Sequence, residues 1–203
     1  MEFSEILRRR RMFRSFSDRP VPANDVEKII AAAFRAPSAG FSQGVELLVL
    51  ATAAQRRRFF EAVTTPGWLE SSKTHRGLDN APVVILPLYD ESRYVERYGD
   101  ADKQSSAWSD ASKWPAPYWL VDCSFSTMLL LAQVVDLGLG ALFFAIDRGE
   151  DQLREAFDIP ERLRFLGAVA IGYPGSSAKV GSAARRVRRP SSEVIHRERY
   201  GQS

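Results

Sequence analysis

Residues 24–51, NDVEKIIAAAFRAPSAGFSQGVELLVLA, decide the fold because they join a helix to a strand through a tight turn. Apolar residues recur at intervals of three and four over 26–34, which predicts an amphipathic helix. This helix must end near Arg35, because the residue before Pro37 is biased away from helical dihedrals. The next apolar run, 45–51, is short and bounded by turn residues, which favours a buried strand. We therefore expect a domain that mixes α-helices and β-strands.

The rest of the chain continues this pattern, and its 203 residues suit a single domain spanning 1–203. The longest apolar element, 118–137, reads as a helix that is apolar on nearly every side, so it should be central or lie in a subunit interface. Asp122 is expected to serve the start of that helix, where the helix dipole favours a carboxylate. Further strands are expected at 81–88, 141–146 and 166–173, and further helices at 3–10, 52–63 and 151–157.

Residues 89–117 differ from the rest because they are polar, aromatic-rich and poor in periodicity. A structureless stretch of this length is unusual unless it is functional or disordered, and its tryptophans favour an ordered cap or lid. Trp108, Trp114 and Trp119 could roof a pocket and select planar ligands by stacking, or they could simply pack the cap onto the core. Beyond it, residues 175–203 are expected to form an extended C-terminal arm.

Positive charge gathers near the two ends of the chain. The formal net charge is only +3, yet 8–14 and 185–189 are both rich in arginine. The two clusters could meet around one anion, or they could be independent solvated tails. A nucleic-acid or anionic-surface binding module is the least favoured reading, because the net charge is small and no recognition motif is present.

Composition also bears on the cellular setting. Cys123 is the single cysteine and lies in an apolar stretch, which fits a small hydrophobe in a reducing compartment. The N-terminus has the wrong order of residues for a secretory signal, and no apolar run reaches the roughly 18 residues of a membrane span. We expect a cytoplasmic protein. His75 and His196 lack metal-ligand spacing and suit surface or capping roles, so no metal site and no catalytic side chain is assigned.

The turn at 36–43 is a candidate ligand site between a helix and a strand. Ser38 and Ala39 are small enough for a planar ring or a phosphate to approach the backbone, and Ser42 and Gln43 supply hydrogen-bonding groups. The alternative is an ordinary helix stop, which the same residues would also satisfy.

Five pieces of sequence occur in a fixed order: RRMFRSFSDRPV at 10–21, APSAGFSQ at 36–43, GLGA at 138–141, the strand that ends in GYP at 172–174, and RRP with EVIH within 188–196. Taken together, they resemble the flavin-dependent nitroreductase family. The resemblance implies an α+β, three-layer fold with a central mixed, mostly antiparallel sheet flanked by helices, assembled as an intertwined homodimer with FMN at the interface.

The resemblance also implies roles for individual residues. Those expected to bind FMN are Arg10, Arg11, Met12, Arg14, Phe144 and Ala145, with Arg186 and Arg188 from the arm and Pro37, Ser38, Ala39, Ser42 and Gln43 from the other subunit. Phe41, with the three tryptophans named above, is expected to line the substrate pocket.

Three departures from the family pattern affect the expected site. Met12 replaces a common serine and therefore removes a hydroxyl, while Phe41 replaces the usual asparagine and removes an amide. Apolar residues around Phe144 and Ala145 stand where glycines are frequent, so the surroundings of the flavin ring should be tighter and more apolar.

An enzyme of this kind would use FMN to pass electrons from NADH or NADPH to a nitroaromatic, a quinone or a similar planar acceptor in a ping-pong cycle. A flavin-dependent dehydrogenase or oxidase of a biosynthetic pathway, on the same fold, is the alternative. The expected partners are the small acceptor and a second copy of the chain, with no role for nucleic acid or a membrane.

Overall fold

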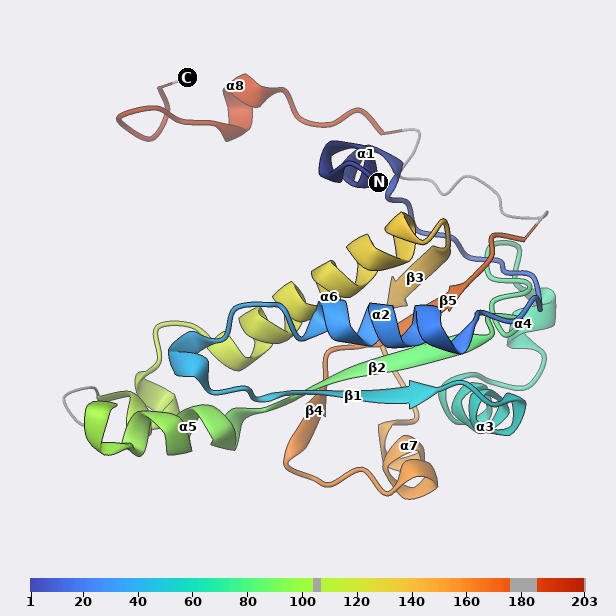
Figure 1. The fold of residues 1–203 in the computed structure, drawn as a ribbon, viewed down its shortest axis with the longest axis horizontal. Helices are drawn as coiled ribbons and strands as arrows, with labels where there is room; N and C mark the ends of the chain where they lie inside the picture. Colours follow the sequence, from blue (N-terminus) through green and yellow to red (C-terminus); the bar gives the residue numbers. More distant parts are fainter. Residues whose placement is uncertain (104–106, 176–185, 203) are drawn as a thin grey trace.

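The computed structural model describes residues 1–103, 107–175 and 186–202, which form an α+β fold (Figure 1). The strands are β1 (Val45–Leu50), β2 (Val83–Asp90), β3 (Gly140–Phe144), β4 (Leu163–Phe165) and β5 (Ala168–Gly172). The helices are α1 (Phe3–Arg9), α2 (Ala23–Ala33), α3 (Ala53–Val63), α4 (Trp68–Ser71), α5 (Glu91–Gly99), α6 (Tyr118–Asp136), α7 (Glu150–Phe157) and α8 (Ser191–Val194), with single 3-10 turns at Ala39–Phe41, Ala101–Lys103, Ala107–Ser109 and Ala111–Lys113.

The strands form one sheet in the order β1-β2-β5-β3, with β4 also paired to β2. The first half of β2 pairs with β5 and its last three residues pair with β4, so β4 and β5 share one side of β2. Every strand pair in the described residues is antiparallel. Two isolated bridges are present in the described residues: the Phe16–Pro174 bridge is antiparallel, and the Met12–Ala141 bridge is parallel and ties the N-terminal segment to the edge strand β3.

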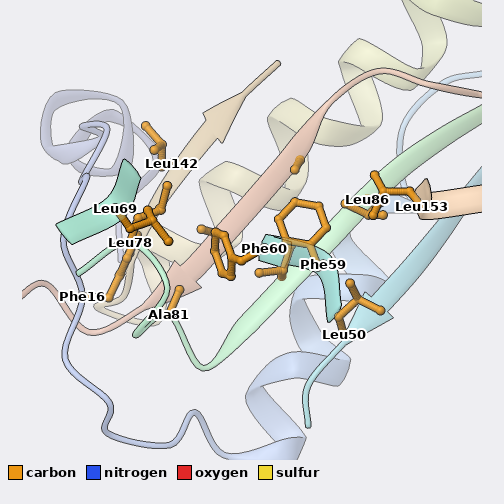
Figure 2. Close-up of a cluster of buried hydrophobic side chains, with 13 residues drawn as sticks. Phe16, Leu50, Phe59, Phe60, Leu69, Leu78, Ala81, Leu86, Leu142 and Leu153 are labelled. Carbon is orange, nitrogen blue, oxygen red and sulfur yellow. The ribbon is translucent and has the colours of Figure 1, made fainter. Parts of the chain in front are cut away.

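Helices cover both faces of the sheet, which gives the expected three layers. Because side chains alternate along a strand, Val84 and Leu86 of β2 point to one face while Val83 and Ile85 point to the other. The first pair joins Phe59, Phe60 and Leu153 of α3 and α7 in the cluster drawn in Figure 2. The second pair packs with side chains of α2 and α6.

The strands expected at 45–51, 81–88, 141–146 and 166–173 are confirmed as β1, β2, β3 and β5, with shifted ends. The short elements β4 and α4 were not predicted, because three or four residues carry no readable periodicity. Residues 89–117, which show little periodicity, contain α5 and three 3-10 turns in their described part. This segment is called the cap, and its role as a lid stays a prediction.

Helix α6 corrects the expectation that no apolar segment is long enough for a membrane span. Its 19 residues are long and apolar enough by composition, and polar residues such as Asp122 and Ser126 interrupt the run only locally. In this fold α6 is a core helix: Leu130 and Val134 are completely buried against α2 and the sheet.

Candidate functional site

The segment after α1 carries the first arginine cluster and is fixed to the sheet by its backbone. The N–H of Phe13 donates to the carbonyl of Ala141 at 2.9 Å, and the N–H of Phe16 donates to Gly77 at 3.0 Å. The Phe13 ring packs on Gly140, where an added Cβ would lie 2.8 Å from a ring carbon. Arg11 and Arg14 therefore emerge from a backbone that is held between β3 and the loop around Gly77.

A cavity of about 530 Å³ lies at the end of β3. It brings three segments together: the end of α3 with the following turn, the loop that starts at α4, and the residues that follow β3. Its lining consists of Phe60, Val63, Thr64, Thr65, Trp68, His75, Leu78, Phe144, Ala145, Asp147 and Arg148. Phe144 and Ala145, both expected to lie near a flavin ring, are thus placed in one concave and largely apolar site.

His75 is a titratable residue in the lining of this cavity. Its ring stacks on Trp68 with centroids 5.3 Å apart, and Nδ1 lies 2.9 Å from the hydroxyl of Thr74. Burial, and to a smaller extent the positive charge of Arg14, lowers the pKa of His75 below its usual value. Arg14 is not among the residues that line the cavity, but its segment lies beside the loop that carries His75, because the N–H of Phe16 donates to Gly77.

The turn that follows α2 is held by a network of hydrogen bonds. Ser38 accepts from the N–H of Gln43 at 3.0 Å, and the Ser42 hydroxyl donates to Ala39 at 2.6 Å. Phe41 and Gln43 both have left-handed backbones, with φ of 58° and 53°. Phe41 is 72% exposed, so its side chain stands out from the surface of the chain.

Asp122 does not serve the start of α6 as expected. Its side chain is 3% exposed, and Oδ2 accepts hydrogen bonds from the N–H of Ala39 at 2.8 Å and from the hydroxyl of Tyr94 at 2.9 Å. The residue before α6 is Pro117, and no side chain caps the helix there. Asp122 therefore connects α6 to the turn and to the cap.

The tryptophans of the cap pack on one another and on α5. Trp114 is 8% exposed and lies edge-on to Tyr94 and Tyr98, with centroids 5.9 and 4.8 Å away. Trp108 and Trp119 are half-buried around it. Within one chain the three tryptophans join the cap to the body, and their pocket-lining role stays a prediction.

The structure places the expected site residues in separate regions of the folded molecule. Figure 1 shows the turn at 37–43 beside α5 at one end and α4, which carries Trp68, at the other. Met12 is half-buried and packs its side chain against both core clusters. Arg186 and Arg188 are exposed on the C-terminal segment. Their meeting with the first arginine cluster remains an expectation.

Several cavity residues were not predicted from the sequence, above all Trp68, His75 and the pair Thr64 and Thr65. The stretch that contains them shows no periodicity, and His75 was expected to be an ordinary surface residue. The adjacent Pro66-Gly67 turn was the available signal, because it breaks α3 and returns the chain toward β3.

Comparison with known proteins agrees with this arrangement. The Nitroreductase family model matches residues 7–173. A protein of Archaeoglobus fulgidus, provisionally named an NADH dehydrogenase/NAD(P)H nitroreductase, is 29% identical over 94% of both chains. The FMN reductase [NAD(P)H] of Bacillus subtilis is 26% identical over 94% of this chain and 71% of its own length.

Solved structures give the same fold. A nitroreductase family protein of Streptococcus pneumoniae superposes with a TM-score of 0.72 at 20% identity, covering 97% of this chain and all of that one (100%). NfrA2 of B. megaterium gives 0.73 at 20% identity, with 98% and 76% covered. This chain belongs to the nitroreductase family.

Proposed function

We propose that this chain is an FMN-dependent NAD(P)H oxidoreductase that reduces small planar acceptors such as nitroaromatics or quinones. The observation that carries the proposal is the cavity at the end of β3, which Phe144 and Ala145 line together with Trp68 and His75. Family membership and the name of the B. subtilis relative support the same cofactor and electron donor.

The residues around the cavity fit a flavin. The side chains of Phe60, Trp68 and Phe144 offer flat apolar surface of the kind that planar rings occupy. Arg14 and Arg148 place positive charge near and within the lining, which favours an anionic cofactor. When bound, FMN would supply hydride and electron transfer between NAD(P)H and the acceptor.

A second copy of the chain is part of the proposal. Figure 1 shows the turn at 37–43 on the opposite side of the molecule from α4, whose Trp68 lines the cavity, so we assign the turn and the cavity to two different flavin sites, each completed by the partner copy. Apolar side chains exposed on α1 and α6, including Phe3, Leu7, Phe125 and Met128, provide a surface for that copy to cover. A cytoplasmic location accords with this assignment.

An absorbance spectrum followed by anaerobic titration tests the function. Purified protein mixed with FMN and freed of excess ligand should keep a flavin spectrum, and NADH or NADPH should bleach it until an added quinone restores it. Protein that retains no flavin would contradict the proposal. Stable flavin that neither nicotinamide reduces would point instead to a dehydrogenase or oxidase with another donor.

The C-terminal arginines need a separate experiment. We expect the double variant Arg186→Ala, Arg188→Ala to raise the FMN dissociation constant by about tenfold, because each substitution removes a proposed charge-assisted hydrogen bond to the FMN phosphate. The melting temperature of the core should not change, since both side chains are exposed. Exposed Arg93→Ala is the matched control, and equal FMN affinity in all these proteins would make the arm a solvated tail.

A further inference from the structure

We infer that Asp122 is a positioning residue for the flavin-facing turn, acting together with Tyr94 of the cap. The inference rests on the proposed function, because it takes residues 38–43 as part of the partner copy's flavin and acceptor site. It adds that the geometry of this turn is set from beneath by a buried carboxylate on α6.

One carboxylate oxygen of Asp122 links α6 to the turn and to α5. Oδ2 accepts both the backbone N–H of Ala39 and the phenol hydroxyl of Tyr94. Tyr94 has no exposed surface, and burial together with the adjacent Asp122 raises the pKa of its hydroxyl. The hydroxyl therefore stays protonated and donates, and α5, α6 and the turn are linked through a buried site.

The cap holds the same turn from a second direction. Arg97 donates from Nε to the carbonyl of Gly40 at 2.8 Å. Gly40 has φ of 61°, and an added Cβ would lie 2.6 Å from the ring of Tyr98, so backbone and ring are in close contact. The turn is thus bonded to α6 at Ala39 and to α5 at Gly40.

These bonds matter because packing holds Ala39 and Gly40 but not the exposed residues Phe41 and Gln43. Left-handed backbones are uncommon outside glycine, and they persist only where the surroundings determine them. Phe41 and Gln43 both adopt this conformation, and Phe41 is too exposed for its side chain to anchor it. The direction in which Phe41 and Gln43 project toward a ligand therefore depends on the bonds at Ala39 and Gly40.

The test compares the FMN dissociation constant and the steady-state constants for a quinone among variants. Asp122→Ala removes the acceptor of the buried Tyr94 hydroxyl and of the partly buried Ala39 N–H, and we expect about tenfold weaker FMN binding and a higher KM for the quinone with a smaller change in kcat. Asp122→Asn should restore most of the affinity, because an amide oxygen can accept the bonds that Oδ2 accepts. Tyr94→Phe should fall between these variants.

Ser126→Ala is the matched control. Ser126 is 1% exposed on the same helix and donates to Ala33 at 2.9 Å, so its loss also costs a buried hydrogen bond but leaves the turn alone. We expect FMN affinity and KM to match the parent protein. If Asp122→Ala destabilises the protein no differently from Ser126→Ala and keeps parental FMN affinity and KM, Asp122 has a structural role only and the inference is wrong.

Amide hydrogen exchange separates this inference from the proposed function. In protein without flavin, Asp122→Ala and Tyr94→Phe should speed exchange at Ala39 and Gln43, while Ser126→Ala should not. Failure of the parent protein to bind FMN would contradict the proposed function. Unchanged amide exchange at Ala39 and Gln43 in these variants would contradict the positioning role of Asp122. If Asp122→Ala does not fold, Tyr94→Phe and Asp122→Asn carry the same comparison.

Discussion

His75 shows at the scale of one residue how the cavity changes the chemistry of its wall. The ring is half-buried against Trp68, and its lowered pKa comes mainly from burial and then from Arg14. The unfolded chain therefore binds a proton at this ring at a higher pH than the folded chain does. At neutral pH we expect the uncharged imidazole, which can accept or donate a hydrogen bond in the cavity.

His75→Gln should flatten the pH dependence of stability on the acid side. For the parent protein, the free energy of unfolding should rise with pH between the lowered pKa and the ordinary 6.5 of histidine, then level off. Denaturant titrations at several pH values measure this rise, with Lys73→Gln, which removes a charge from the same loop but no imidazole, as control. An identical pH profile for His75→Gln and the parent would show that His75 is not the cause.

Gly140 is the residue on which the position of the arginine segment depends. Gly140→Ala places a Cβ 2.8 Å from the ring of Phe13 and 3.1 Å from Pro174, and we expect a loss of about 1–3 kcal/mol in unfolding free energy. Gly99→Ala, at the end of α5 with nothing within 4 Å, should be neutral or slightly stabilising. Equal stabilities of the two variants by denaturant titration would contradict the close packing described for Phe13.

Among the elements, those with a clear apolar period were predicted, whereas helix α5 within the cap was not. The strand at 45–51 and the helix over 26–34 are predictable from the sequence. Burial of both faces of the strand gives a nearly continuous apolar run, and burial of one face of the helix gives a repeat of three and four residues. Helix α5 buries Tyr94 and Tyr98, which are four residues apart and so share one face of the helix. A single pair of apolar positions among charged neighbours is a weak signal, and the contact of Tyr94 with Asp122 of α6 depends on the tertiary fold.

We expect the packing of the cap to depend on the side chain of Trp114. Trp114→Ala removes a buried ring that contacts Tyr94, Tyr98 and Trp119, and we expect a loss of about 3–5 kcal/mol if the cap unfolds together with the body. A cap that loosens alone would instead show faster proteolysis within 91–117 at a nearly unchanged melting temperature. Tyr200→Ala, with a 91% exposed ring, is the control. Parental stability and proteolysis of Trp114→Ala would contradict the packing.

At the scale of the whole molecule, the sequence supplied the pieces of the candidate site but not their arrangement. Of the residues that the family resemblance indicated, Phe144 and Ala145 line one cavity, and the positive charge of Arg14 lowers the pKa of His75 in the same lining. Trp68 and His75 enter that cavity only because the loop after α3 folds back over the end of β3. The turn at 37–43 lies on the opposite side of the molecule from α4, so the flavin-binding role proposed for this turn requires the proposed partner copy.

FMN affinity of a cavity-filling variant tests the central claim most directly, because the cavity beside β3 is the proposed flavin site. Ala145→Phe adds a ring to its lining, while Ala53→Phe adds the same ring to a neighbouring hollow of about 670 Å³ that shares Phe60, Thr64 and Thr65 with the cavity but lacks Phe144 and Ala145. Quenching of FMN fluorescence measures both dissociation constants. We predict at least a tenfold rise for Ala145→Phe and parental affinity for Ala53→Phe; parental affinity in Ala145→Phe would place the flavin elsewhere.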